Sequence, residues 1–150
     1  MIPLAVLVVV TFLTRLAGRF VVNPLDSWPA ATRVGLAVMF CFTALAHFNA
    51  MRQDMINMVP PWVPDPGLVV TFTGVAEILG AIGLLVPAPR VAAAVGLVLL
   101  LISVLPANVH AALNAVPLRG QPPAPLWPRV GLQVLFIALV AWSGIVRPRR

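Results

Sequence analysis

The stretch VTFTGVAEILGAIGLLVP, residues 70–87, decides the fold. It has the length and apolarity of a membrane-spanning helix, yet Glu77 lies close to its middle. A carboxylate at that depth costs about 2.5–3.5 kcal/mol on insertion scales, so it normally faces protein or water rather than lipid. At helical spacing the polar and small residues gather on one side, which predicts close packing against other helices: Thr73, Glu77, Gly80, Ala81 and Leu84, with Gly74 at the edge.

Glu77 supports two interpretations that the sequence leaves open. In the first, it is a neutral carboxyl group that hydrogen-bonds a neighbouring helix and holds the bundle together. In the second, it is an acid that carries a proton or binds a ligand, which is the default hypothesis for an ionisable group inside a membrane.

The composition around this stretch is that of an integral membrane protein. Hydrophobic residues make up 61% of the chain and charged residues only 9%. All ten cationic residues are arginines, spread mostly singly between apolar runs, so we expect topology markers and no nucleic-acid partner. The single cysteine, Cys41, excludes an intrachain disulfide and a CxxC redox pair.

Five apolar runs predict an all-α membrane protein with one domain over residues 1–150. Arg15 and Arg19 follow the apolar part of the first run, the reverse of a secretory signal, so we expect a retained span. Pro106 is expected to kink the fourth span, and the proline-rich segment around Trp62 is expected to cap the bundle at the membrane surface. The predicted spans are about 2–22, 33–50, 68–86, 91–113 and 129–146.

The arginines also predict an orientation in the cell (plasma) membrane. Seven lie on one side of the predicted spans, namely Arg15, Arg19, Arg33, Arg90, Arg147, Arg149 and Arg150, against three on the other, namely Arg52, Arg119 and Arg129. The positive-inside rule then places the amino terminus outside and the carboxyl terminus in the cytoplasm.

Polar residues of four spans fall in the outer half of the bilayer, which predicts a polar pocket there: His47, Asn108, Arg129 and Gln133, with Thr73 and the deeper Glu77.

Four short motifs in order resemble the DoxX-like family of small membrane proteins. They are His47-Phe48, Val59-Pro60-Pro61-Trp62-Val63-Pro64, Thr73-Gly74-Val75-Ala76-Glu77 and Pro106-Ala107-Asn108. The similarity covers roughly residues 34–142. It implies a four-helix transmembrane bundle, to which the first span here is an addition, and it makes His47, Glu77 and Asn108 motif residues. The family name derives from a subunit of a thiosulfate:quinone oxidoreductase, and other relatives are linked to thiol or oxidative-stress complexes and to membrane-protein assembly.

Three functions stay open from the sequence. We expect a binding or accessory subunit of a membrane redox system, with a quinone-like ligand in the polar pocket, rather than a self-sufficient enzyme. The alternatives are a non-catalytic assembly or scaffold subunit and a small-solute or proton pathway. No haem, flavin or metal motif is recognised in the sequence, although His47 and Glu77 leave a metal site as a weaker idea. The expected partners are the lipid bilayer, a membrane or peripheral protein, and a second copy of the chain.

Overall fold

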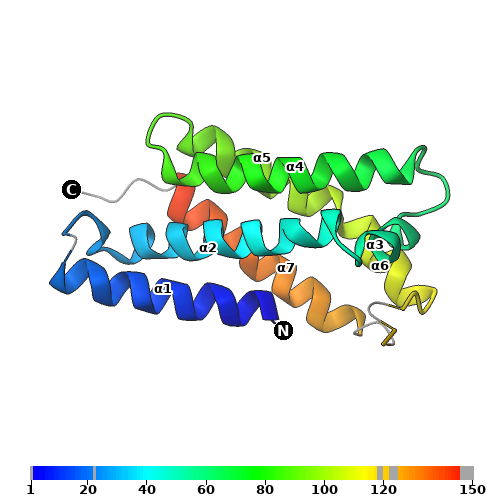
Figure 1. Cartoon of the computed structure of the whole chain (residues 1–150), viewed down its shortest axis with the longest axis horizontal. Helices are drawn as coiled ribbons and strands as arrows, with labels where there is room; N and C mark the ends of the chain where they lie inside the picture. Colours follow the sequence, from blue (N-terminus) through cyan, green and yellow to red (C-terminus); the bar gives the residue numbers. More distant parts are fainter. Residues whose placement is uncertain (1, 22, 118–119, 122–124, 146–150) are drawn as a thin grey trace.

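The computed structural model describes residues 2–21, 23–117, 120–121 and 125–145, and over these ranges the architecture is all-α (Figure 1). Within them, five helical spans are long and apolar enough to cross a membrane, as the sequence predicts, and they indicate a multi-pass membrane protein. The elements are α1 (Ile2–Phe20), η1 (Asn23–Leu25), α2 (Trp28–Ala44), η2 (Leu45–Phe48), α3 (Arg52–Met58), α4 (Pro66–Leu85), α5 (Arg90–Ser103), α6 (Leu105–Leu113), α7 (Leu126–Val140) and η3 (Ala141–Ile145).

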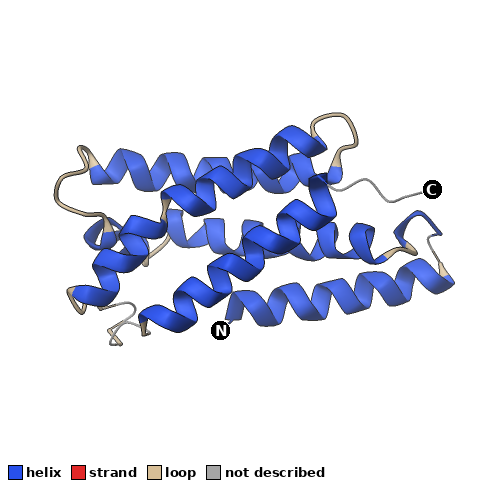
Figure 2. Ribbon diagram, turned by 180° about the vertical axis from the view of Figure 1, so that it is seen from behind, coloured by secondary structure: helices blue, strands red, loops and turns tan. Residues whose placement is uncertain are grey.

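The spans run back and forth along one long axis, and α2 is the central one (Figures 1 and 2). It packs against α1 on one side and α4 on the other, while α4 also packs against α5. The fraction of residues buried is 50% in the apolar window of the span that contains α2. The helix α1 packs mainly on α2 at the edge of the bundle and does not reach α3 and α6 (Figure 1).

The core is built from α2, α4, α5 and α7, and small residues let these helices approach closely. A Cβ atom added to Gly80 would lie 2.5 Å from the Leu97 side chain, and one added to Gly83 would lie 2.5 Å from Ala93 Cβ. The face predicted for α4 therefore contacts two neighbours: Gly80 packs on α5, whereas Gly74 and Glu77 face η2 and α2. The largest buried side chains around it are Leu36, Met39, Phe40, Leu84, Leu97 and Val140.

The second span differs from the sequence prediction at both ends. It begins at Trp28 rather than near residue 33, because the Ser27 hydroxyl caps the helix by accepting from Ala30 N at 3.3 Å and a proline follows in the first turn. The α-helix ends at Ala44 and continues only as the short 3-10 segment η2. The Asn49 side chain then accepts from Met51 N at 2.8 Å, a local turn that separates the span from α3.

The fourth span is interrupted, as Pro106 predicts. Helix α5 ends at Ser103 and α6 begins at Leu105, with proline in its first turn. Proline has no N–H to donate to the carbonyl one turn earlier, and its ring crowds that carbonyl. Because the last four carbonyls of a helix have no partner within it, the break opens acceptors in the middle of a membrane span.

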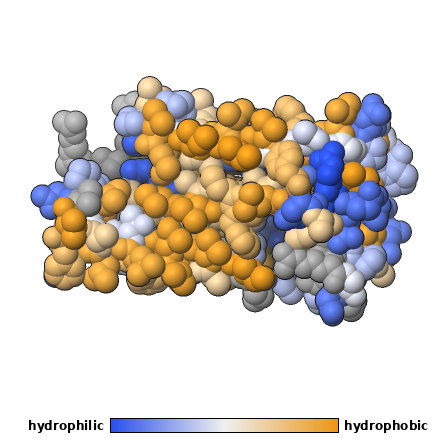
Figure 3. Space-filling model, viewed as in Figure 1, coloured by the Kyte–Doolittle hydropathy of each residue, from blue (hydrophilic) through white to orange (hydrophobic). Residues whose placement is uncertain are grey.

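The two ends of the bundle differ in character. At one end α4 ends at Leu85 and α5 begins at Arg90, and we call this the α4–α5 end. The other, the α3–α6 end, carries the proline-rich segment. In Figure 3 apolar residues cover the surface over α1, α2 and α4, and hydrophilic residues gather at the α3–α6 end. This distribution is expected for a membrane-spanning bundle, in which the apolar surface contacts lipid and the polar end contacts water.

Candidate functional site

The carboxyl group of Glu77, in α4, forms a hydrogen bond to the central helix α2. Thr43 Oγ1 lies 2.7 Å from Glu77 Oε2 and 3.1 Å from the Phe40 carbonyl oxygen. The Thr43 hydroxyl has one hydrogen and can donate only one of these two bonds. Both contacts are hydrogen bonds if Glu77 is protonated: Glu77 then donates to the Thr43 oxygen, and Thr43 donates to the Phe40 carbonyl. The geometry thus suits a neutral Glu77 that ties α4 to α2. Within the part of the chain that the structure describes, no ion pair involves Glu77.

His47 lies one helical turn further along the same contact between α2 and α4. It is 4% exposed and packs directly on Gly74, where an added Cβ would lie 2.7 Å from His47 Cβ. Its Nδ1 atom has no hydrogen-bond partner among the described residues. We refer to the line of Thr43, Glu77, His47 and Gly74 as the α2–α4 seam.

Arg52, which the sequence analysis treated only as a topology marker, closes this seam at the α3–α6 end. Its guanidinium donates to the His47 carbonyl at 3.0 Å, to the Gly67 carbonyl at 2.9 Å and to Thr71 Oγ1 at 2.9 Å. One side chain from α3 therefore fastens η2 to the start of α4. The planar, forked guanidinium allows arginine to make several such bonds at once.

Thr73, a further candidate from the sequence, uses its hydroxyl within its own helix. It donates to the Val69 and Val70 carbonyl oxygens at 3.0 and 3.1 Å. Such back-bonding satisfies the hydroxyl locally and contributes no polar group to a neighbouring helix.

The remaining candidates meet elsewhere, between the break in the fourth span and α7. Asn108 Nδ2 donates to Gln133 Oε1 at 3.1 Å, and Arg129 lies 3.5 Å from Asn108 Oδ1. Gln133 Nε2 donates to the Leu101 carbonyl, one of the acceptors at the end of α5. The structure therefore brings Asn108, Arg129 and Gln133 together as one group. No hydrogen bond between described residues joins this group to Glu77 or His47.

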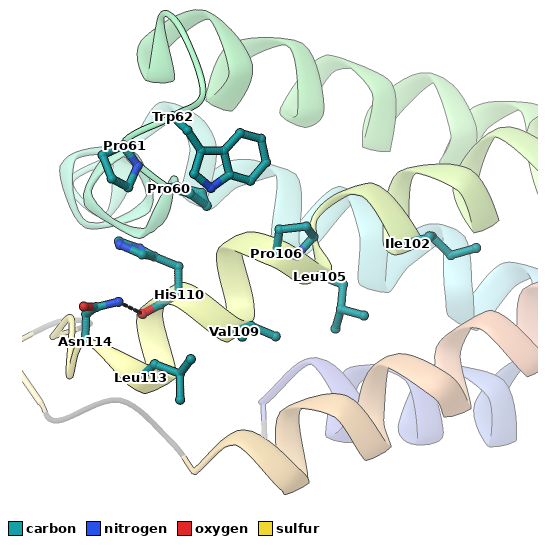
Figure 4. A pocket seen from close by; sticks show the side chains of 10 residues that line it. All are labelled: Pro60, Pro61, Trp62, Ile102, Leu105, Pro106, Val109, His110, Leu113 and Asn114. Atoms are coloured by element: carbon teal, nitrogen blue, oxygen red, sulfur yellow. Dashed lines mark hydrogen bonds between the residues drawn. The ribbon is translucent and has the colours of Figure 1, made fainter.

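A pocket of about 630 Å³ lies at the α3–α6 end, and its lining is mostly apolar (Figure 4). One wall is the proline-rich segment after α3, with Trp62; the other is α6 together with the last turn of α5. The lining residues are Pro60, Pro61, Trp62, Ile102, Leu105, Pro106, Val109, His110, Leu113 and Asn114. Apolar walls with a few polar groups are the usual composition of a small-molecule site.

Among the residues that line the pocket, His110 has the side chain that can either donate or accept a proton. Its Nδ1 atom lies 3.1 Å from the Met58 carbonyl oxygen. A carbonyl can only accept, so Nδ1 carries the hydrogen, and in the neutral ring Nε2 is left as an acceptor. No described residue hydrogen-bonds Nε2. Asn114 Nδ2 donates to the His110 carbonyl at 2.9 Å, which steadies the end of α6.

The sequence analysis did not select His110 or this pocket as the site. Helical spacing places His110 about 200° from Asn108, and the structure confirms that Asn108 faces α7 whereas His110 faces the end of α3. A usable signal was present: Pro60, Pro61 and Trp62 form a stiff apolar segment, and Pro106 breaks the helix that carries His110. What the sequence could not supply was the contact between segments about fifty residues apart.

The groups that commonly hold metals do not gather: within residues 2–21, 23–117, 120–121 and 125–145, no three His, Cys, Asp or Glu side chains form a cluster.

Compared with known families, residues 36–147 match the family described as "Domain of unknown function (DUF8561)". The matched range begins inside α2, so α1 lies outside it. No curated protein and no solved structure matches the chain.

Proposed function

The chain belongs to the DUF8561 family, and we propose that it is a DoxX-like binding or accessory subunit of a membrane redox system. Its pocket at the α3–α6 end would hold a small, largely apolar ring that carries a hydroxyl group, of which a reduced quinone is the leading example. The residues that touch this ligand are then Trp62, His110 and the apolar side chains of α6.

The observation that carries this proposal is the combination of an apolar pocket with one unused acceptor. The volume of about 630 Å³ falls within the range of small-molecule sites. Trp62 supplies an aromatic surface on which a flat ring can stack. With Nδ1 donating to Met58, the Nε2 atom of His110 accepts from a ligand hydroxyl.

The same tautomer predicts which redox form of a quinone binds better. A quinol hydroxyl can donate to Nε2, whereas a quinone carbonyl can only accept and would face another acceptor. We therefore expect the reduced form to bind more tightly. The chain supplies binding and a proton acceptor, and we assign electron transfer to a partner subunit.

The four DoxX-like motifs support this proposal because they meet in pairs. Pro60, Pro61 and Trp62 line the pocket together with Pro106, so the second and fourth motifs form its walls. His47 packs on Gly74, so the first and third motifs form the α2–α4 seam. Motifs distant in sequence thus converge on one contact and one pocket.

A scaffold role, in which the polar face of α4 engages the helices of a partner, is the second candidate. It gains little from the seam, because Glu77, Thr43 and the carbonyl of Phe40 satisfy one another within the chain. The proton pathway is less well supported, because the described contacts of Glu77 end at Thr43 and do not continue to the pocket.

The orientation stays part of the proposal: amino terminus outside, carboxyl terminus in the cytoplasm, in the cell membrane. Arg15, Arg19, Arg33 and Arg90 lie at or near the α4–α5 end, which this orientation makes cytoplasmic. Arg119 and the three carboxyl-terminal arginines of the count lie outside the described residues. In a Cys41→Ser background, an impermeant thiol reagent should label Gln121→Cys on intact cells and leave Ser27→Cys unlabelled, and the opposite pattern would invert the topology.

The pocket is tested by titrating the purified protein in mild detergent with a short-chain quinol and following tryptophan fluorescence. Quenching should depend on Trp62 and disappear in Trp62→Phe, while Trp28→Phe is the matched control at the other end of the bundle. The oxidised quinone should bind more weakly to the parent. Equal loss of quenching in both variants, or no binding at all, would refute the pocket.

A further inference from the structure

The α4–α5 end holds an arginine that is inserted between helices rather than pointing freely into water. Arg33, in the second turn of α2, is half-buried, and its NH1 atom donates to the Ser143 carbonyl oxygen at 2.8 Å. Ser143 lies in η3, a short π-helical segment that packs against both α2 and α5. A π-helical turn is rare and is found frequently at functional sites.

A second guanidinium belongs to the same end of the bundle. Arg90 is the first residue of α5, and one turn later Ala94 packs on Gly144, the neighbour of Ser143, where an added Cβ would lie 2.5 Å from Ala94 Cβ. The Nε atom of Arg90 is buried and has no hydrogen-bond partner within the described chain. The helix cap at Pro89 provides no side-chain acceptor, so the first N–H groups of α5 also point toward this end without one.

The acidic residues that could neutralise this pair are all placed elsewhere. The chain has four Asp and Glu residues in total. Asp26 pairs with Arg15, which also stacks over the Trp28 ring. Glu77 bonds Thr43. The other two, Asp54 and Asp65, lie in α3 and at the start of α4, at the α3–α6 end.

Ser143 adds an independent sign of a missing partner. It is 1% exposed, and its hydroxyl has no hydrogen-bond partner in the described chain, although its own carbonyl holds Arg33. Buried hydroxyl groups are usually bonded, so an orphaned one on the residue that holds Arg33, at the end where Arg90 also lacks a partner, points to an anion with several acceptor oxygens. A phosphate group fits this chemistry, because arginine binds phosphate through parallel N–H···O bonds.

We propose that Arg33, Arg90 and Ser143 form a binding site for the phosphate of an anionic phospholipid headgroup. Arg33 and Arg90 lie near the starts of α2 and α5, and Ser143 lies in η3, so we place the site at the membrane surface of the α4–α5 end. The lipid phosphate would replace the absent acid and hold α2, α5 and η3 together. This inference is independent of the pocket, which lies at the other end of the bundle.

The test is to titrate the full-length protein, in a neutral detergent, with short-chain phosphatidylglycerol and to measure the dissociation constant. Arg33→Gln and Arg90→Gln should each weaken binding at least about tenfold, the loss expected for charge-assisted hydrogen bonds. Arg19→Gln removes the same charge from an exposed position at the same end and should change binding little. Arg33→Lys keeps the charge without the fork and should bind more weakly than the parent.

Two further titrations separate the sources of phosphate. Phosphatidylcholine, with no net charge, should bind more weakly than phosphatidylglycerol, and inorganic phosphate should compete only weakly, since it lacks the acyl chains. Strong competition by inorganic phosphate, lost in Arg90→Gln, would assign the site to a free phosphate instead of a lipid. An equal loss in Arg19→Gln would overturn the proposal by showing only diffuse charge attraction, and equal binding of both lipids would overturn it by showing that the acyl chains alone are bound.

Discussion

The α2–α4 seam and the pocket at the α3–α6 end use similar polar residues in opposite ways. In the seam, Glu77 and Thr43 bond each other, and His47 is enclosed against a glycine. In the pocket, His110 is held through one nitrogen and offers the other. The seam uses Glu77 and Thr43 to hold helices together and encloses the unpaired Nδ1 atom of His47, whereas the pocket leaves His110 Nε2 available to a ligand.

The difference follows from how closely the backbones approach. In the seam, Gly74 of α4 has no side chain, so His47 of the segment η2 packs directly on the helix. The pocket lies beside the break at Pro106 and the proline-rich segment, where backbones cannot pack closely. Polar groups inside this bundle are therefore better judged by how closely the neighbouring backbones pack than by their chemistry alone.

The largest effect is expected from closing the seam sterically. Gly74→Ala places a methyl group less than 3 Å from the buried His47 and from Phe48, so we expect a loss of about 3 kcal/mol through overpacking. Gly96→Ala, in helix α5 with open space around it, is the control and should leave stability unchanged or slightly higher. Both variants are compared by their free energy of unfolding in detergent. If the two substitutions change that free energy equally, the seam is not a close contact.

Removing the Glu77 carboxyl group should have the next largest effect. Glu77→Ala leaves Thr43 without its partner and should cost about 2 kcal/mol. Glu77→Gln can donate to the same hydroxyl and should keep nearly all stability and all quinol binding. A Gln variant that is stable but no longer functions would instead give Glu77 a protonation role and revive the proton pathway.

A smaller loss is expected where α7 meets the break in the fourth span. Gln133→Met keeps the length of the side chain but orphans the Leu101 carbonyl and the Asn108 amide, so unfolding should become easier by about 1–2 kcal/mol. Val134→Ala, an exposed neighbour on the same helix, is the control for a general effect on α7. If thermal unfolding shifts equally in both, the polar group contributes nothing specific.

The smallest change in stability, below about 1 kcal/mol, is expected for Pro106→Ala, because the restored backbone donor offsets the lost packing of the ring. The straightened span should, however, move His110 relative to Trp62 and weaken quinol binding. If Pro106→Ala binds quinol as tightly as the parent, the helix break is a tolerated irregularity that quinol binding does not require.

The sequence was sufficient to predict the five spans, the small-residue face of α4 and the interruption at Pro106, because each depends on local composition and spacing. It also assigned Arg129 and Gln133 to the same predicted pocket as Asn108, and both contact Asn108 in the structure. The pairing of Glu77 with Thr43, however, depends on which helices are neighbours. The start of α2 was missed because Ser27 and Pro29 suggest a loop as readily as a helix cap.

The most direct test of the central claim is to locate a bound ligand by photocrosslinking. A photoactivatable quinol analogue should label Trp62 and the segment 102–114, as mapped by mass spectrometry of the digested protein, and excess quinol should suppress that labelling. His110→Phe should reduce the labelling without unfolding the protein. Labelling confined to residues 43–48 and 73–77 would place the ligand in the α2–α4 seam and contradict the account.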